Sequence, residues 1–571
     1  MAVIGLLVIA GYLFLRSSLK TEKAPKKIAD NELEAAIDLR PLFIARLNEI
    51  INKGSDGLYQ FTTEDLKVDV LAGTVVFIKP KLVPDFSLLP ELEKKHKAPD
   101  DVFTISLDSL SINGLDLQDV LSKKSIDLDE LLLIHPAIKV VHQKRKNQKI
   151  QENDTATLYK RIMGQMKHIA VKKIIIKEGT LENKNLTKNK TSKLTGLSVL
   201  LNDLLLDSST QKGRDRFLFS KSATISFKDY ATTTGNKRYR VGMDEVTING
   251  TQNSLQIKNL ALIPQDSKEA FSQKVKTRTE RYSIKIPALQ LKNIAWWDLM
   301  NEEEMKADEA IIAHCTIEVY LDRSLPPSSK SKIGSYPHQL LMALPLPVDV
   351  RVVTIKNSDI VYEEFNPASG KTGKLFLNDF SARATNITNM PNEIKKNRFA
   401  KIEATALVKH SIPLKANLTF DLAQYKSGKF SASVAIGGTN NLQILNDIAE
   451  PLGMVSLKTG TITSLTSTLD GNNTKASGKV VLQYQNLHIR ILKKDEGEPG
   501  GFRKKTIISK LANAFVIKDN NPSPGNEVRK EDAFFKRDIH GSFFNLIWKT
   551  TLVGILKTIG APAKLANPPG S

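Results

Sequence analysis

Residues 282–291 read YSIKIPALQL, and residues 103–112 read FTISLDSLSI. In the first stretch Ile284 and Ile286 alternate with polar residues, and in the second Phe103 and Ile105 do the same. Alternation with a period of two is typical of a β-strand that buries one of its two faces. Both stretches are therefore expected to be strands.

The same alternation recurs along most of the chain, while long helical patterns are few. This argues against the parallel folds in which a helix follows each strand, and it predicts an all-β protein. Further strands are expected at Leu255–Ile263, Ile317–Leu321, Val348–Ile355, Leu414–Leu422, Phe430–Ile436, Ile462–Leu469 and Lys479–Leu492.

The two opening stretches belong to an internal duplication. Shifting residues 103–183 by 179 positions (282 − 103 = 179) lays them on residues 282–362 without a gap. Repetition of a strand unit along one chain predicts an elongated sheet whose cross-section repeats. Identical or similar residues then coincide, for example Ile105 with Ile284, Leu107 with Ile286, and Leu110 with Leu289.

Composition and charge exclude several classes of function but do not identify one. The chain has 571 residues, of which 41% are hydrophobic, so it is long enough for several domains but too polar for a multi-span transporter. Lys and Arg exceed Asp and Glu by 21 (82 − 61 = 21), which suits anionic partners. Nucleic acid is not an expected partner, because the basic residues are interleaved with acidic ones and only 6% of residues are aromatic. The single cysteine, Cys315, excludes an intramolecular disulfide or a multi-cysteine zinc module.

No group of residues has the pattern of a catalytic centre, and we expect no enzyme activity, cofactor or metal site. Gly370–Thr372 carries the last letters of a phosphate-binding loop but joins two predicted strands, which favours a hairpin turn. His135 and His314 coincide in the duplication, yet their neighbours offer no shared ligands, so a structural role is favoured. The acidic run at residues 302–304 is not repeated in the other copy and is interpreted as a solvated face.

An apolar segment, AVIGLLVIAGYLFL, occupies residues 2–15. Extended to residue 19, it reaches the lower length limit of a membrane-spanning helix, and we expect an uncleaved anchor. A cleaved signal peptide is the alternative, but no basic region precedes the segment and no small-residue cleavage site follows it. The positive-inside rule conflicts with an exported main domain, because the nearest basic residues, beginning with Arg16 and Lys20, all follow the segment.

The composition changes after residue 492. Residues 493–501 and 518–530 are rich in charged and turn-forming residues and enclose a short apolar stretch near residues 507–517. Residues 542–559 read SFFNLIWKTTLVGILKTI and are expected to form an amphipathic helix, which either caps the sheet or lies on a membrane. The candidate membrane-contact residues are Phe544, Trp548, Leu552, Ile555 and Ile559.

Several of these segments resemble the AsmA-like, TamB-related proteins of Gram-negative envelopes. The likeness is carried by the apolar N-terminal segment, by VVTIKNSDIVYEE at residues 352–364, by LFLNDFSARATNITN at 375–389 and by GTITSLTSTLDGNNTKASGKVVLQYQNLHIRIL at 460–492. RDIHGSFFNLIWKTTLVGILKTIG at residues 537–560 is similar to the C-terminus of Bacteroidetes members. The resemblance implies a long, curled β-sheet with an apolar inner face, anchored by one helix in the inner membrane with most of the chain in the periplasm. It also implies lipid movement or outer-membrane maintenance, as in bridge-like lipid-transfer proteins.

The alternating strands support the implied groove in one respect. A sheet of this kind has an apolar face that must be covered by another layer, closed into a barrel or filled by something else. Covering helices are scarce in the sequence, so acyl chains are expected to fill a groove, at about 0.8 kcal/mol per buried methylene. The alternative is a scaffold or assembly factor for outer-membrane proteins, or an adhesin-like stalk, with the face filled by its own side chains. The candidate lipid-groove residues are Ile105, Leu107, Leu110, Ile284, Ile286 and Leu289.

The expected partners are a phospholipid or another envelope lipid, the inner membrane and outer-membrane assembly proteins. The expected organisation is a transmembrane anchor at residues 1–19, a linker and helix at 20–56, a first β-groove repeat region at 57–281, a second at 282–492, flexible loops with a short strand at 493–541, an amphipathic helix at 542–560 and a tail at 561–571.

Overall fold

The computed structural model describes residues 40–69, 72–114, 125–145, 168–210, 216–494, 502–504 and 517–561. The chain is mostly β, with 56% strand and 17% helix, and its strands form one large sheet of 24. The all-β, repetitive sheet predicted from the alternation is therefore confirmed. The expected N-terminal anchor, most of the linker, the apolar stretch near residues 507–517 and almost all of the tail lie outside the described residues. Within the described part of the chain, no helix combines the length and apolarity needed to cross a bilayer.

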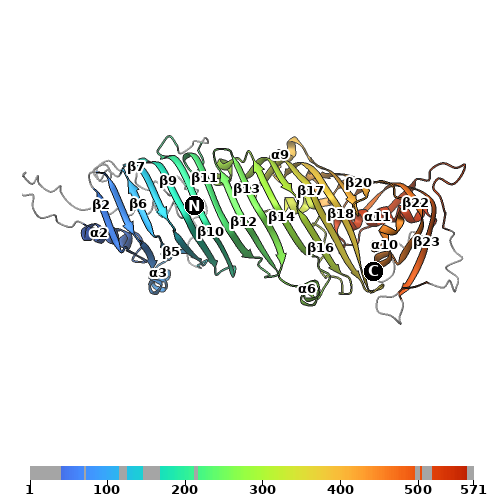
Figure 1. The fold of residues 1–571 in the computed structure, drawn as a ribbon, viewed down its shortest axis with the longest axis horizontal. Coiled ribbons are helices and arrows are strands. Elements are labelled where there is room, and N and C mark those ends of the chain that lie inside the picture. The colour runs from blue at the N-terminus through green and yellow to red at the C-terminus, as the bar shows by residue number, and fades with distance from the viewer. Residues whose placement is uncertain are drawn as a thin grey trace, which may run out of the picture. The chain divides into compact units, whose positions relative to one another are not determined.

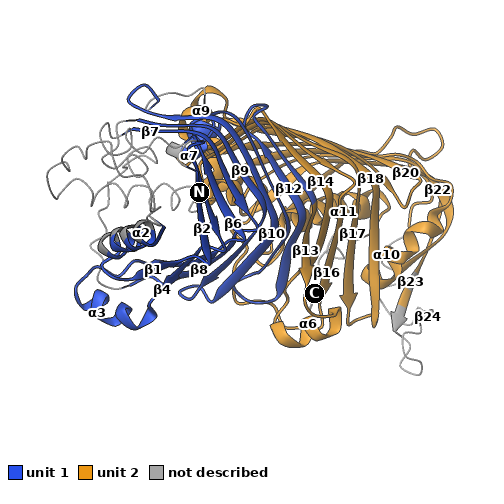
Figure 2. Cartoon of the chain, turned by 60° about the vertical axis from the view of Figure 1, so that its left-hand side comes forward, with its two compact units in different colours: residues 1–258, 296–302 blue, residues 259–295, 303–571 orange. Residues whose placement is uncertain are grey.

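The chain divides into two compact units, shown in Figure 2. Unit 1 comprises residues 1–258 and 296–302, and unit 2 comprises residues 259–295 and 303–571. The chain passes from unit 1 to unit 2 within β13 (Ser254–Pro264). The sequence interpretation drew the boundary between the two repeat regions later, at residues 281 and 282.

In unit 1, a strand that spans the sheet can consist of two shorter parts in series, and Figure 1 shows the strands of this unit side by side. β7 and β8 are the two parts of one such strand, and both run parallel to the unbroken β9. The remaining ladders described in this unit are antiparallel. They join β7 and β8 to the strands that precede them, as far as β1 and β2, and they join β9 to the strands that follow it, as far as β12. The elements are α2 (Arg40–Gly54), β1 (Tyr59–Thr62), β2 (Asp65–Asp69), β3 (Thr74–Ile78), β4 (Lys81–Pro84), the 3-10 turn η1 (Phe86–Leu88), α3 (Leu89–Lys94), β5 (Asp101–Ser106), β6 (Ser109–Asn113), β7 (Ser125–Ile134), β8 (Ala137–His142), β9 (His168–Asn185), β10 (Lys190–Leu206), β11 (Ser220–Thr233), β12 (Tyr239–Asn249) and α7 (Trp296–Asn301).

Unit 2 begins with the same arrangement. β14 pairs antiparallel with β15 and β16, which both run parallel to the long strand β17. Antiparallel strands then follow in chain order to β23, which also pairs with β24 and β25. The elements are α6 (Lys268–Val275), β14 (Arg281–Lys292), β15 (Met305–Ala313), β16 (Thr316–Asp322), α8 (Pro337–Met342), β17 (Val348–Asn366), β18 (Lys371–Thr388), α9 (Pro391–Lys396), β19 (Phe399–Val408), β20 (Ile412–Asp421), η2 (Leu422–Ser427), β21 (Phe430–Ile436), η3 (Leu442–Leu445), α10 (Asn446–Gly453), β22 (Val455–Gly471), β23 (Lys475–Lys494), β24 (Phe502–Lys504), β25 (Glu531–Lys536) and α11 (Phe543–Thr558).

The duplication predicted from the sequence is present in the strand registers. Leu128 pairs with Val171 in unit 1, and Ala307 pairs with Val350 in unit 2, so both partners move by 179 positions (307 − 128 = 350 − 171 = 179). Positions with a positive backbone φ recur with the same shift, as in Gly114 and Asn293, His135 and His314, and Glu178 and Asn357. The two units therefore repeat the strand pairing and also the places where the strands bend.

Local predictions agree closely with the elements. The seven predicted strand ranges all fall within strands, except that Leu422 begins the turn η2. The helix predicted at residues 542–559 is α11, and the Ser542 hydroxyl caps its N-terminus by accepting a hydrogen bond from the Asn545 N–H. The glycine of the phosphate-loop-like segment, Gly370, lies in the hairpin between β17 and β18 with φ of 68°.

Candidate functional site

Unit 1 carries a row of apolar side chains, one from each of eight strands. Residues that pair directly across neighbouring strands lie on the same face of a sheet. The candidate residue Leu110 pairs with Phe77 on one side and Leu133 on the other. Leu133 and Phe77 are buried, with exposed fractions of 1% and 4%. The complete row is Leu66, Phe77, Leu110, Leu133, Ile176, Val199, Ile225 and Ile248.

A second apolar row contains the candidate residue Ile105. The rings of Phe61, from this row, and Phe77, from the first row, meet edge-on with centroids 5.6 Å apart, which places both rows on one face. Leu107 lies between the rows at the break between β5 and β6 and is buried. The complete second row is Phe61, Leu82, Ile105, Ile138, Leu181 and Leu194.

Unit 2 repeats both rows in the same register. The candidates Ile284 and Leu289 take the places of Ile105 and Leu110, and Ile286 lies between the two rows. On β14 to β17 the members of these rows are only partly buried. One row is Ile284, Ile317, Ile360, Leu377, Val408 and Ile412. The other is Leu289, Ile312, Ile355, Ala382, Ala404, Ala416 and Val434.

Ile284 and Leu289 are five residues apart, a spacing that would place them on opposite faces of a regular strand. On β14 the alternation slips by one residue, because Pro287 and Ala288 are both exposed. The neighbouring long strand β17 is also irregular at this point. Its register with β18 shifts around Asn357, which has φ of 46°. A β-bulge re-aims the side chains that follow it, so both rows lie on one face. We call this surface the apolar face.

The opposite face of unit 2 is polar. Lys285, next to Ile284 on β14, is exposed. The row beside the Leu289 row consists of Gln290, Ile311, Thr354, Arg383, Glu403 and Asn417. The two faces of this sheet therefore differ in chemistry, and the strand pairing assigns each candidate residue to one of them, which the sequence pattern alone did not do.

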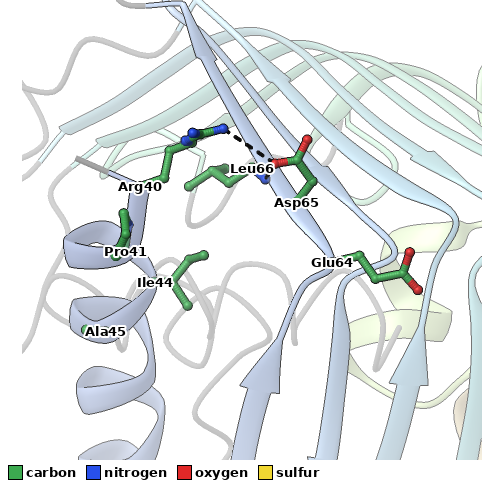
Figure 3. Close-up of a pocket in the computed structure, with 7 residues that line it drawn as sticks. All are labelled: Arg40, Pro41, Ile44, Ala45, Glu64, Asp65 and Leu66. Carbon is green, nitrogen blue, oxygen red and sulfur yellow. Dashed lines mark hydrogen bonds and ion pairs between the residues drawn. The ribbon is translucent and has the colours of Figure 1, made fainter. Parts of the chain in front are cut away.

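In unit 1, helix α2 covers the start of the apolar face. Its residues Ile44 and Leu47 pack against a buried cluster that includes Leu66 and Phe77. A hollow of about 420 Å³ lies between α2 and β2 and is bordered by an ion pair of 3.6 Å between Arg40 and Asp65. Figure 3 shows the residues that line it. A helix was expected here, but its contact with the apolar face was not.

In unit 2, helix α11 covers the last part of the apolar face. Its buried side includes Leu546, Thr551 and Gly554. The Thr551 hydroxyl lies 2.8 Å from that of Ser467 on β22, and Gly554 lies against Val480 on β23. Here the protein covers the apolar face with its own side chains. This is what we expect of residues 542–559 if they form a helix that caps the sheet.

The candidate membrane-contact residues of α11 differ in environment. Phe544 and Trp548, one turn apart, expose 67% and 50% of their surface. Leu552 and Ile555 are partly buried against the core around β23, and Ile559 is buried within that core. This corrects the sequence interpretation for Ile559, because the helix turns its C-terminal end into the protein. Only Phe544 and Trp548 are largely exposed among the five.

Helix α6 packs on the polar face of unit 2 through a partly buried ionic cluster. The Lys268 Nζ lies 2.6 Å from a carboxylate oxygen of Glu363 and 3.3 Å from one of Glu318. Burial by itself raises the pKa of Glu363, but Lys268 and Lys374 outweigh it and hold that pKa below its usual value. The cluster joins the helix to the strands, and it has a structural role.

Among the remaining residues singled out from the sequence, Glu302 and Glu304 lie close to Asp298, with one carboxylate oxygen from each of the three within 4.8 Å of the others. Acidic groups of this kind at a protein surface are common without a bound ion. His135 Nδ1 lies 2.7 Å from Asp108, and its Nε2 lies 3.2 Å from Glu178, at an exposed strand break. The hydrogen bond to Asp108 raises the pKa of His135. Glu302 and Glu303 are exposed, as a solvated face predicts.

Comparison with known proteins identifies no relative: no family model matches the chain, and no curated protein matches it. The apolar face is therefore the feature from which a function has to be inferred.

Proposed function

We propose that this is an AsmA-like envelope protein that binds lipids on its apolar face and conducts them along a β-groove. In this proposal it is anchored in the inner membrane, with most of the chain in the periplasm, and it serves the biogenesis or maintenance of the outer membrane. The observation that carries the proposal is the paired apolar row from Ile284 to Leu377, whose members stay partly exposed while the opposite face is charged.

The physical reason is the cost of leaving such a surface in water. An acyl chain placed on these rows gains about 0.8 kcal/mol for each methylene that it buries, or on the order of 10 kcal/mol for a whole chain. Part of this gain is lost in ordering the chain, so the net affinity is smaller. Because the rows cross several strands, lipids would be able to move from strand to strand without leaving an apolar surface.

The exposed aromatic pair on α11 supports contact with a membrane. Phe544 and Trp548 extend from a helix whose opposite side is firmly packed. Large aromatic side chains on an anchored helix are suited to the interfacial region of a bilayer. In the proposal this end of unit 2 contacts a membrane, while the apolar segment at residues 2–15 provides the anchor.

One observation favours the second candidate, a scaffold or assembly factor for outer-membrane proteins. Over β22 and β23 the apolar face is filled by α11 and not left for a ligand. If the rest of the face were filled in a similar way by a protein partner, lipid binding would not be needed.

Mass spectrometry of lipids extracted from the detergent-purified full chain distinguishes the two. The lipid proposal expects near-stoichiometric lipid in the wild-type protein, much less in Leu289→Asp and an unchanged amount in Gln290→Asp. Leu289 and Gln290 are adjacent but belong to rows on opposite faces, so the pair is a matched control. Wild-type protein that carries no lipid above the level of an unrelated envelope protein would contradict lipid binding and favour the scaffold.

A further inference from the structure

Strand β25 is an edge strand of the sheet in unit 2, because within the described residues it pairs only with β23. The N–H of Arg537, just after β25, donates to the Thr474 carbonyl at 2.8 Å, which fixes the phase of this ladder. In an antiparallel pair, successive residues direct their backbone groups alternately toward the partner strand and away from it. Arg537 faces β23, so Asp532, Phe534 and Lys536 direct their N–H and carbonyl groups to the open edge.

The backbone groups at this edge are largely unpaired in the described structure. The N–H groups of Asp532, Phe534 and Lys536 have no acceptor among the described residues. The Lys557 Nζ donates to the Asp532 carbonyl at 2.6 Å. A carbonyl oxygen has two lone pairs, so this contact leaves room for a second hydrogen bond.

The first strand of unit 1 shows how this protein closes a sheet edge. Among the described residues β1 pairs only with β4, and the N–H groups of Tyr59 and Phe61 point outward. The Tyr59 N–H donates to the Ser55 hydroxyl at 3.1 Å, and the Phe61 N–H donates to the Asn48 side-chain oxygen at 2.9 Å. Side chains from α2 and the turn after it thus occupy that edge. An edge without such acceptors is a template for another strand.

The side chains of β25 make its edge complementary to itself. Asp532, Phe534 and Lys536 lie on the exposed face of the strand, and Phe534 exposes 56% of its surface. In an antiparallel pair of two β25 strands centred on Phe534, Asp532 of each copy is opposite Lys536 of the other. The two Phe534 side chains are opposite each other. Opposite charges and aromatic pairs in directly opposed positions both stabilise strand pairing.

Electrostatics favour this register over its neighbours. A register centred on Asp532 sets two carboxylates opposite each other, and one centred on Lys536 sets two ammonium groups opposite each other, which is unfavourable. Lys536 already faces Lys475 on β23, and neither lysine has an ion-pair partner among the described residues. Asp532 lies 3.8 Å from Lys479 and is 85% exposed, so it can accept a second cation. The register centred on Phe534 supplies Lys536 of the other copy.

We infer that two copies of this chain associate edge to edge through β25, in an antiparallel pair centred on Phe534. This inference goes beyond the proposed function and does not depend on lipid binding. In the dimer the unit 2 sheets of the two copies form one continuous sheet. A contact of six residues from each copy is small for a protein interface, so the dimer is weak and reversible.

Cysteine cross-linking of the detergent-solubilised full chain tests the register. Opposed residues that exchange hydrogen bonds have Cα atoms about 5.5 Å apart, within the range of a disulfide. Phe534→Cys should therefore form a covalent dimer under a mild oxidant. The native Cys315 is buried and should not react. A mixture of Asp532→Cys and Lys536→Cys proteins should also cross-link. Either of these two alone should not, because identical residues lie roughly 13 Å apart along the strands.

Sedimentation over a wide range of concentration tests the charges. Asp532→Lys sets like charges opposite each other at both ends of the strand pair and should weaken dimerisation about tenfold. Adding Lys536→Asp to the same chain restores opposite charges across the dimer and should return the affinity close to that of the wild type. Within each copy this exchange keeps one attractive and one repulsive pair with Lys475 and Lys479, so the fold should be unaffected.

A wild-type chain that stays monomeric at every concentration would overturn the inference, and so would a folded Phe534→Cys protein that does not cross-link. Either result would mean that Lys557 and the short length of β25 keep this edge unpaired. Cross-linking of Asp532→Cys alone as rapidly as in the mixture would overturn the antiparallel register. A dimer that responds to neither charge change would place the interface elsewhere and would likewise overturn the inference.

Discussion

His135 and His314 occupy equivalent positions in the two units, 179 residues apart (314 − 135 = 179), and both have a left-handed backbone, with φ of 46° and 55°. Each lies between two short strands that continue one another, β7 with β8 and β15 with β16. The N–H of each histidine donates to a backbone carbonyl of the long neighbouring strand at 2.9 Å, from His135 to Lys177 and from His314 to Lys356. The pair therefore marks a repeated bend of the strand.

The bend predicts how His314 tolerates substitution. A β-branched residue is strained in the left-handed region, so His314→Val should destabilise the protein by about 1–2 kcal/mol. His314→Gly should cost nothing or stabilise slightly, because glycine adopts this conformation readily. Chemical denaturation of the full chain measures both. A valine variant as stable as the glycine variant would show that the bend does not depend on this backbone conformation.

A charge on the apolar face should stop lipid passage. Ile284→Asp places a carboxylate among acyl chains, which costs several kcal/mol if it stays unpaired. Transfer of fluorescent lipid between vesicles should therefore be abolished, while circular dichroism shows that the strands are retained. Lys285→Asp, on the exposed opposite face, should transfer normally. Intact transfer by both variants would rule out a lipid-filled groove at this repeat.

Trp548 should matter for membrane contact and not for folding. Because half of its surface is exposed, Trp548→Glu is expected to leave the melting temperature unchanged. Binding to phosphatidylglycerol-containing vesicles should fall roughly tenfold, because the variant loses an aromatic side chain that the wild-type protein would bury in the bilayer. Trp548→Phe should bind almost normally. A lower melting temperature with unchanged vesicle binding would mean that the exposed side of α11 has a structural role only.

Stability should fall in mild acid because of His338. This residue exposes 2% of its surface, its ring stacks on Phe420 with centroids 4.9 Å apart, and neither ring nitrogen has a hydrogen-bond partner within the described structure. Burial lowers the pKa of His338 to about 4, against the opposing charge of Asp421. The folded state thus disfavours the proton that the unfolded chain accepts near its usual pKa of about 6.5.

As the pH falls, the unfolded chain binds a proton at His338 before the folded protein does, so acid favours unfolding. Stability from the neutral ring is complete above about pH 6.5 and is lost as the pH falls toward 4, by up to roughly 3 kcal/mol. Melting temperatures of the wild type should decline across this window, and those of His338→Phe should decline less. Parallel pH profiles of the two proteins would assign the acid sensitivity to other groups.

The contact between α11 and β23 predicts a steric effect. A methyl group on Gly554 would lie 2.4 Å from the Val480 Cβ, so Gly554→Ala should destabilise the protein by about 1–3 kcal/mol. Gly453→Ala is the control, because a methyl group there meets no atom within 4 Å. Equal melting temperatures for the two variants would show that α11 shifts easily on the sheet.

The sequence predicted the strands and the repeat because both follow from local alternation. It placed Ile284 and Leu289 among the candidates, but it could not assign them to one face. That assignment depends on the slip at Pro287 and Ala288, a bulge fixed by pairing with neighbouring strands and not by local propensity.

Burial of α11 was harder to predict for a related reason. The helix packs through Thr551 and Gly554, small residues that fit close to the strands, and not through its largest apolar residues alone. A pattern search gives most weight to Phe544 and Trp548, which are exposed.

The parallel ladders have a consequence for the time course of folding. Residues that pair between β7 and β9 are 43 positions apart (171 − 128 = 43), whereas Asn185 and Lys190 in the next hairpin are only five apart. Closing the longer loop costs about 2 kcal/mol more in chain entropy, so these ladders form late within each unit. On the ribosome, which adds about 5–20 residues per second, β7 and β8 wait several seconds for β9 with an unpaired edge. During that interval the nascent chain is open to pairing with other strands.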